Sequence, residues 1–282
     1  MNFSFRFLVT VILTGSIYLL PLATRAGTTP EEVKAFEDFK TKADKGDSAA
    51  QLKLGIFYAN GEGVTKDLRE AFKWCKKSAE HGEVDAQTTL GIFYANGIGV
   101  EKNEAEAVKW YRKAADKGDS MAQLSLGVCY RGGHGVDKDD IEGVKWYKKA
   151  AEQDVAMAQY NLGRCYATGK GVMKDDVEAT IWYKKAAEQG HALAQNDLGL
   201  CYATGIGVTK DLVEAYAYLN LAGVTLENAR KNLKSIESMM SPDAQIYGQQ
   251  RTNELKKQFE TPVQSLEELR KAIEQEKLRK GA

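Results

Sequence analysis

The sequence predicts an all-α fold, a solenoid of helix-turn-helix repeats with a period of 36 residues. The period is visible because Ala50, Ala86, Ala122, Ala158 and Ala194 each begin a segment of the form AQxxLG. A GxGV turn follows each segment, and a second stretch of apolar residues at helical spacing follows the turn. A period of this length is typical of stacked helical units, which usually present a long surface to a partner.

The composition excludes several classes of function. Of the 282 residues, 43% are hydrophobic and 28% are charged, and the formal net charge is zero. The chain therefore has enough apolar material to bury a core. It lacks the basic excess of proteins that bind nucleic acid or anionic membranes, so we expect no nucleic-acid partner.

Residues 1–26 have the layout of a secretory signal peptide. Arg6 precedes an almost wholly apolar run over residues 7–22, and Ala26 is a small residue before Gly27. We expect cleavage after Ala26 and export to the periplasm or beyond the cell, with no stable membrane anchor left. An uncleaved anchor is the alternative, although the apolar run falls short of the ~20 residues of a spanning helix.

Five repeats are expected, at residues 48–83, 84–119, 120–155, 156–191 and 192–227. In the first, a helix A over 48–60 should end at Gly61, a residue suited to the left-handed conformation. Helix B should begin after Asp67, whose side chain can cap it, with Glu70 reciprocating as a capping box. The same pair recurs as Asn103/Glu106, Asp139/Glu142, Asp175/Glu178 and Asp211/Glu214.

Glycine and tryptophan recur inside the helices, where they predict packing roles. Glycine inside helix A costs about 1 kcal/mol of helix stability relative to alanine. A favourable interaction must compensate for this cost, and the simplest one is close packing of two helices at the glycine. Tryptophan repeats on the apolar stripe of helix B, which predicts core positions. Asp154 replaces the glycine that ends helix B elsewhere, because aspartate tolerates the left-handed region. The expected structural residues are Gly55, Gly91, Gly127, Gly163, Gly199, Trp74, Trp110, Trp146 and Trp182.

Both ends of the repeat array are expected to be capped. Residues 27–47 form a lone helix B in this interpretation, and residues 228–282 form C-terminal capping helices and an amphipathic tail. A helix should start at Ser241 and Pro242, with proline in its first turn. After Pro262 a narrow apolar stripe either folds back on the last repeat or binds a partner or a second copy. Its residues are Val263, Leu266, Leu269 and Ile273, with Leu278 as a further candidate.

The combined series AQxxLGxxYxxGxGVxKDxxEAxxWYxKAAExG closely resembles the Sel-one-like repeat, a relative of the tetratricopeptide repeat with a two-glycine turn. The resemblance covers residues 48–227. It implies a right-handed α-solenoid, and it implies an exported adaptor or scaffold in envelope maintenance or host interaction, as many bacterial members are.

Four cysteines in an exported protein would first suggest disulfides, but the period argues against them. Cys129, Cys165 and Cys201 occupy the same position in successive A helices. Equivalent atoms of neighbouring helices lie roughly 8–10 Å apart, beyond the ~7 Å that a disulfide allows between Cα atoms. Cys75 is on a helix B, two repeats from the nearest of them. We expect four reduced, largely buried thiols.

No catalytic, cofactor-binding or metal-binding residue is predicted, and the protein is expected not to be an enzyme. Cysteine-rich relatives imply one alternative, a β-lactam-binding protein or weak β-lactamase-type hydrolase. This chain lacks their paired cysteines and the SxxK, SDN and KTG motifs. Residues 163–170 resemble a phosphate loop, but Gly171 stands where a hydroxyl should hold magnesium. His81, His134 and His191 are too far apart in register for a metal site.

Positions of helix A that differ between repeats are free to encode recognition, and three of them fall at i, i+3 and i+7 on one helix face. In related solenoids helix A lines the concave side. We expect this face to be a polar groove that binds a protein or peptide partner, and a glycan strand is another possible ligand. The alternative is an ordinary solvated helix face without a binding function. The candidate partner-binding residues are Lys53, Asn60, Asn96, Arg131, Tyr160, Arg164 and Thr168.

Overall fold

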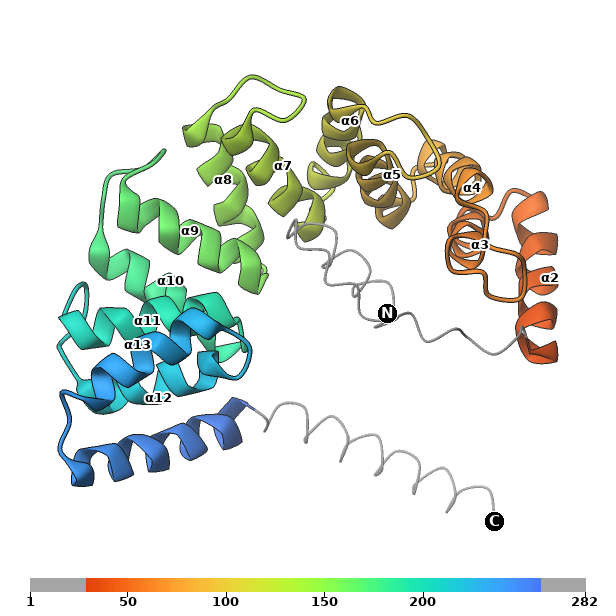
Figure 1. The fold of residues 1–282 in the computed structure, drawn as a ribbon. Helices are drawn as coiled ribbons and strands as arrows, with labels where there is room; N and C mark the ends of the chain where they lie inside the picture. The colour runs from red at the N-terminus through yellow and green to blue at the C-terminus, as the bar shows by residue number, and fades with distance from the viewer. Residues whose placement is uncertain (1–28, 260–282) are drawn as a thin grey trace, which may run out of the picture. The chain divides into compact units, whose positions relative to one another are not determined.

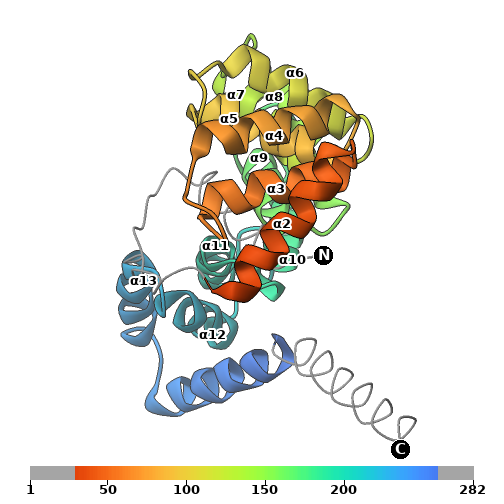
Figure 2. The same ribbon diagram turned by 90° about the vertical axis from the view of Figure 1, so that its right-hand side faces the viewer.

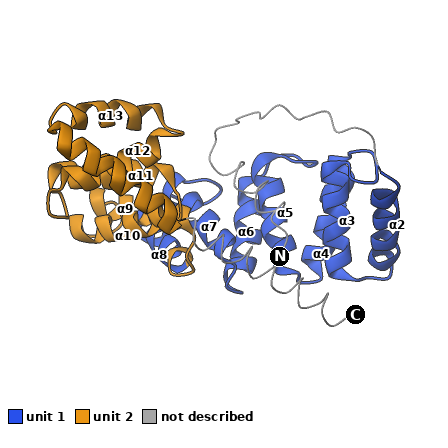
Figure 3. Ribbon diagram, turned by 90° about the horizontal axis from the view of Figure 1, so that it is seen from below, with its two compact units in different colours: residues 1–149 blue, residues 150–282 orange. Residues whose placement is uncertain are grey.

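The computed structural model describes residues 29–259, and these form helices joined by short turns, without a β-strand. The expected signal peptide and the amphipathic tail after Pro262 lie outside the described residues. The chain divides into two compact units, Met1–Lys149 and Ala150–Ala282 (Figure 3). Within residues 29–259 no helix is long and apolar enough to cross a membrane.

Consecutive helices pack against each other within each unit, which confirms the all-α solenoid (Figures 1 and 2). The odd-numbered helices α3 to α11 are the A helices and the even-numbered helices α4 to α12 are the B helices. Unit 1 contains α2 (Pro30–Asp44), α3 (Ser48–Asn60), α4 (Leu68–Glu80), α5 (Val84–Asn96), α6 (Glu104–Ala115), α7 (Ser120–Gly132) and most of α8 (Asp140–Ala151). Unit 2 contains α9 (Ala156–Thr168), α10 (Asp176–Glu188), α11 (Ala192–Thr204), α12 (Leu212–Gly223), α13 (Glu227–Glu237) and a helical segment over 242–259.

The B helices begin at the predicted caps, but the reciprocal capping box is wrong. The Asp67 carboxylate accepts hydrogen bonds from the backbone N–H groups of Arg69 and Glu70. The backbone N–H of Asp67 does not use Glu70, because it donates to the carbonyl oxygen of Tyr58 at 2.9 Å. The Glu70 side chain instead pairs with Lys73 at 2.6 Å. The same backbone bond to the helix A tyrosine recurs at Asn103, Asp139, Asp175 and Asp211.

The interior glycine of each helix A lies where the following helix B comes closest. A Cβ atom added to Gly127 would lie 2.3 Å from Cδ1 of Tyr147, and one added to Gly55 would lie 2.6 Å from Sγ of Cys75. Real Cβ contacts are not this short, so a larger residue would have to push the two helices apart. Gly91, Gly163 and Gly199 meet Tyr111, Tyr183 and Leu219 in the same way.

The glutamine of AQxxLG ties each helix A to the helix B before it. Its Nε2 atom donates to the backbone carbonyl oxygen eight residues earlier, in the last turn of that helix, where carbonyl groups lack intrahelical partners. The five bonds, at 3.2 to 3.3 Å, are Gln51 to Ala43, Gln87 to Ala79, Gln123 to Ala115, Gln159 to Ala151 and Gln195 to Ala187. The glutamine therefore repeats for a reason that the period alone did not reveal.

The tryptophans of helix B combine apolar packing with a repeated cation–π contact. Trp110 and Trp146 are buried, whereas Trp74 and Trp182 are half-buried. A lysine three residues later places its ammonium group over each ring, at 3.9 to 4.2 Å from the centroid. The pairs are Trp74/Lys77, Trp110/Lys113, Trp146/Lys149 and Trp182/Lys185.

The ends of the described array are covered by further helices, α2 before the first repeat and α13 with the segment 242–259 after the last. Helix α2 starts with a complete capping box, Thr29 with Glu32, and buries Phe36 and Ala43 against α3. At the other end Ser241 caps the segment 242–259, and Leu255 is buried beside Tyr218. Asp154 has a φ of 58°, which confirms its left-handed conformation.

Candidate interaction surface

The candidate surface is the A-helix face, which we define by the variable positions of helices α3, α5, α7, α9 and α11. These are Lys53, Ile56, Asn60, Thr89, Ile92, Asn96, Ser125, Val128, Gly132, Asn161, Arg164, Thr168, Asp197, Leu200 and Thr204. The chemistry of this face differs between the two units. In unit 1 its central residues are Ile56, Ile92 and Val128, which are buried or half-buried, beside the buried hydroxyl groups of Thr89 and Ser125. In unit 2 the central residues are Arg164 and Leu200, and the positions equivalent to Thr89 and Ser125 carry Asn161 and Asp197. A charged residue at the central position is therefore found only in α9 among these five helices.

The candidate residues of α3 and α5 do not form a cluster of contacts with one another. Lys53 is half-buried, while Asn60 and Asn96 lie at the ends of their helices. The Asn60 amide donates to Glu62 at 3.0 Å, and the Asn96 amide donates to the carbonyl oxygen of Ile92 at 2.9 Å. Both side-chain NH2 groups thus bind partners at the end of their own helix. The side-chain carbonyl oxygen of each asparagine can still accept a hydrogen bond.

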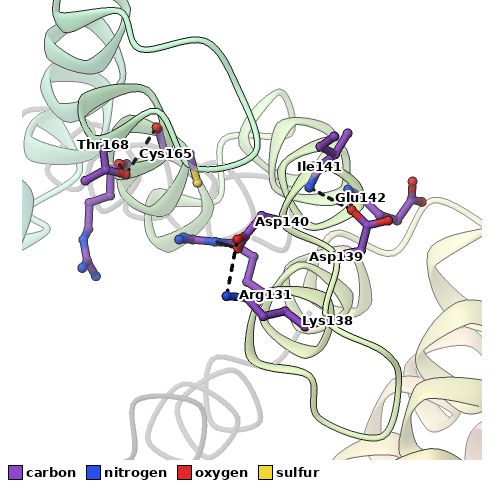
Figure 4. A network of polar contacts seen from close by, with 9 residues as sticks. Arg131, Lys138, Asp139, Asp140, Ile141, Glu142, Cys165 and Thr168 are labelled. Atoms are coloured by element: carbon purple, nitrogen blue, oxygen red, sulfur yellow. Dashed lines mark hydrogen bonds and ion pairs between the residues drawn. The ribbon is translucent and has the colours of Figure 1, made fainter.

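Arg131 is already paired within its own repeat, and its role in partner binding stays a prediction. Its Nε atom lies 3.4 Å from Oδ1 of Asp140, and only 21% of its side chain is exposed (Figure 4). Its guanidinium also lies 5.9 Å from the ring centroid of Tyr147. Both partners are on α8, so Arg131 points at the helix B of its own repeat.

Gly143 explains why arginine fits at position 131. The other four repeats have alanine at both equivalent positions, Ala59 with Ala71 for example. A Cβ atom on residue 143 would lie 2.5 Å from Cγ of Arg131, so the missing methyl group makes room for the arginine stem. Partial desolvation favours the neutral acid at Asp140, but the hydrogen bond from Arg131 and the nearby Lys138 charge outweigh it and lower the pKa of Asp140.

In unit 2 the structure brings Tyr160 and Arg164 together with Asp197. Tyr160 is buried on α9, and its hydroxyl group donates to Oδ2 of Asp197 on α11 at 3.3 Å. The exposed Arg164, one turn after Tyr160, places its guanidinium 5.8 Å from the centroid of that ring. Burial, and next the Asp197 charge, raise the pKa of Tyr160 to about 12, so the hydroxyl stays protonated and donates.

The Tyr160–Asp197 contact continues as a chain of hydrogen bonds along three helices. The Asn196 amide donates to Oδ1 of Asp197 at 2.9 Å, and Asn232 on α13 donates to Oδ1 of Asn196 at 2.9 Å. His191, at the start of α11, lies 4.7 Å from the Tyr160 ring. Burial lowers the pKa of His191, and its Nδ1 atom accepts from the backbone N–H of Ala194. This chain holds the Tyr160 ring, and with it Arg164, in a fixed position.

Two further residues complete this part of the face. The Thr168 hydroxyl donates to the carbonyl oxygen of Arg164 at 2.7 Å and lies 3.5 Å from that of Cys165, so its hydrogen bonds stay within its own helix (Figure 4). Asn161 is half-buried, and within residues 29–259 its amide has no hydrogen-bond partner. Asn161 and Arg164 therefore offer unused donors side by side on one turn of α9.

The sequence reasoning missed the base of this cluster. Asp197 is one of the variable positions but not one of the predicted partner-binding residues, and the prediction also omits Asn196, Asn232 and His191. The available signal was the run of polar residues at one register: Tyr160, Asn196 and Asn232 are each 36 residues apart. Unit 1 has Leu52, Thr88 and Leu124 at this register.

Asp197 gives this cluster a pH dependence with a definite sign. Burial raises the pKa of Asp197, and hydrogen bonds from Asn196 and Tyr160 and the Arg164 charge only partly oppose it. Above the folded-state pKa the ionised Asp197 carboxylate therefore lowers the free energy of unfolding. This loss diminishes as the pH falls through the folded-state pKa. We expect Asp197→Asn to increase the free energy of unfolding at pH 7, with a smaller difference at pH 4, in urea titrations. Asp137→Asn in an exposed turn is the control, and a stability loss at pH 7 confined to Asp197→Asn would contradict the assignment.

The cysteines show no features of a nucleophilic or metal site. All four lie within the described residues and none forms a disulfide; Cys75, Cys129 and Cys165 are buried and Cys201 is half-buried. Burial raises the pKa of Cys75 and Cys129 to about 12, which suppresses the reactive thiolate. Within residues 29–259 no three His, Cys, Asp or Glu side chains are grouped to hold a metal ion.

Known proteins share this repeat and its fold. The profile of the Sel1 repeat matches residues 48–83, 84–119, 120–155, 156–191 and 192–223. A solved Sel1 repeat protein from Oxalobacter formigenes is 32% identical with a TM-score of 0.68, over 79% of this chain and 91% of that one. A protective antigen of uropathogenic Escherichia coli strains, c5321, displays an SLR fold and is 29% identical with a TM-score of 0.55, over 89% of this chain and 60% of that one. No curated protein matches the sequence significantly. Because the repeat profile matches more than half of its residues, the chain belongs to the Sel1 repeat family.

Proposed function

We propose that this protein is an exported, non-catalytic scaffold that binds a protein partner through its A-helix face, with the main contact in unit 2. Sel1 repeat folds are typically scaffolds that mediate protein–protein interaction, and the repeat covers most of this chain. The observation that carries the proposal is the position of the exposed Arg164 and of Asn161, whose amide has no hydrogen-bond partner among residues 29–259, over the hydrogen-bonded base formed by Tyr160 and Asp197.

The geometry suits recognition because the base is already ordered. Binding surfaces lose affinity when flexible side chains must be immobilised. Here Tyr160 is held by Asp197, and its ring supports the guanidinium of Arg164. Arginine and tyrosine in ordered, partly desolvated positions are the residue types that dominate binding energy at protein interfaces.

Export and the class of partner rest on different observations. Export is supported by the signal-peptide layout of residues 1–26, and a protective antigen among the similar structures is compatible with an exposed location. A protein partner is supported by the family. The glycan strand has no such support and is not part of the proposal. The intact mass of the protein recovered from expressing cells tests cleavage before Gly27.

The buried cysteines of residues 29–259 are poor candidates for the nucleophile of the hydrolase alternative. The buried thiols have raised pKa values, and the polar cluster of unit 2 uses Asp197 to accept hydrogen bonds rather than to activate a hydroxyl group in a cleft. Saturable nitrocefin turnover by the purified protein, abolished by one substitution, would contradict the scaffold proposal.

The direct test starts with a partner captured from envelope extract by the purified chain beginning at Gly27. We expect Arg164→Glu to weaken the affinity for that partner at least tenfold, because the variant replaces the exposed donor group with an acceptor of opposite charge. Titration calorimetry gives the dissociation constants. Lys145→Glu is the matched control, since Lys145 is an exposed cation on helix B. An unchanged affinity in Arg164→Glu, or an equal loss in Lys145→Glu, would place the interface elsewhere.

A further inference from the structure

Unit 2 carries an exposed apolar cluster on its B-helix side that the other repeats do not share. Val177 and Ile181 on α10 are 56% and 44% exposed, and Met173 in the preceding turn is 87% exposed. Ile206 is 51% exposed, in a turn that lies against α10 because its carbonyl oxygen is 3.4 Å from Oγ1 of Thr180. We call Met173, Val177, Ile181 and Ile206 the α10 patch.

Ile181 is the most unusual member of the patch. Three other repeats have lysine at this position, paired with the glutamate three residues earlier: Lys73 with Glu70, Lys109 with Glu106 and Lys145 with Glu142. The fourth repeat keeps the glutamate, Glu178, but replaces the lysine with isoleucine. Exposing an isoleucine side chain to water is unfavourable, so this replacement indicates that an apolar surface covers the patch.

The end of the described chain lies beside this helix face. Val177, Ile181, Lys184 and Glu188 follow one stripe of α10, at spacings of four, three and four residues. Lys184 and Glu188 also line a cavity of about 380 Å³ together with Arg251, Leu255 and Gln258 of the segment 242–259. Residue 259, after which the chain continues, therefore lies close to the end of the stripe.

The residues that follow have the sequence of a segment able to cover it. Pro262 disfavours a continuous helix through this point, and Ser265 with Glu268 has the spacing of a capping box for a new helix. Leu266, Leu269 and Ile273 then fall on one face. A helix of twelve residues spans ~16 Å, which is the length of the α10 stripe from position 177 to 188.

We propose that residues 263–278 of this chain fold back and dock on the α10 patch, antiparallel to α10. The turn at Pro262 reverses the chain beside Glu188, and the apolar face of the segment then covers Ile181 and Val177. The acidic first turn, Glu267 and Glu268, falls beside Lys184, so the charges are complementary. Docking removes the apolar patch from water and leaves the A-helix face of unit 2 open to a partner.

The substitution Ile181→Lys tests this docking without threatening the fold, because lysine is the residue of three other repeats. In the full chain we expect hydrogen exchange at residues 266–277 to accelerate at least tenfold in Ile181→Lys. Ile141→Lys, at an exposed apolar position of α8 in unit 1, is the matched control and should leave exchange in this segment unchanged. Unprotected amides at 266–277 in the unmodified protein, or equal exchange in Ile181→Lys, would overturn the proposal.

A photo-crosslinking side chain at position 181 identifies the occupant independently. We expect crosslinks to residues 263–278 of the same chain, in a product with the mass of a monomer and at a yield independent of protein concentration. Crosslinks that join two copies, or that reach another part of the chain in place of this segment, would overturn the proposal.

Discussion

Gly127→Leu should lower the free energy of unfolding by about 3 kcal/mol, although glycine itself is a poor helix former. The reason is the approach of α7 to α8: even the first atom of a side chain at position 127 would overlap the ring of Tyr147. Tyr147 is buried, so its ring cannot swing into solvent. Overpacking of this kind typically costs about 1–3 kcal/mol, and the rest of the leucine side chain adds bulk beyond that first atom.

Urea denaturation followed by circular dichroism measures this loss, with Gly132→Leu as the control. Gly132 is in the same helix and is exposed, and the atoms nearest to an added Cβ would be those of the His134 imidazole, an exposed side chain able to move away. The control should therefore stay within about 0.5 kcal/mol of the unmodified protein. Equal effects of the two substitutions would show that helix propensity, not the contact with Tyr147, sets the requirement for glycine.

This contrast shows which part of the fold the sequence could predict. A residue that every repeat needs recurs at the same position in all five repeats. The interior glycines, the helix caps and the left-handed turns could therefore be recognised from one sequence. The physical partner of each repeated residue could not be read in the same way. The capping box failed because the Asp67 backbone N–H already has the Tyr58 carbonyl as its partner, a contact that residue types alone do not specify.

The candidate surface was less predictable because it depends on what each repeat does differently. Arg131 looked like an exposed variable residue, and only the Arg131–Gly143 pair shows that one exception compensates another within the same repeat. Tyr160 and Arg164 were identified as candidates, yet the acid that holds Tyr160 comes from the next repeat. A contact between two variable positions does not recur in every repeat, so a single sequence can locate the variable face without revealing which of its residues touch.

Gly99→Ala should be among the most destabilising single-methyl changes in unit 1, with a loss of about 3 kcal/mol or more. Gly99 has a φ of +67°, and a Cβ there would lie 1.9 Å from the backbone carbonyl oxygen of Leu68, at the start of α4. The left-handed backbone alone costs roughly 1–2 kcal/mol for a residue with a Cβ. The contact with a backbone atom adds to this, because the whole turn must move away from the preceding repeat.

Gly97→Ala separates the two contributions within the same turn. Gly97 has nearly the same φ, +70°, but its added Cβ would meet nothing closer than 3.4 Å. It should therefore show only the backbone cost of roughly 1–2 kcal/mol in urea titrations. If the difference between the variants arises from the Leu68 contact, hydrogen exchange in the first turn of α4 should accelerate in Gly99→Ala and not in Gly97→Ala. Similar losses in both variants would mean that the second glycine of GxGV serves the local turn and not the joint between repeats.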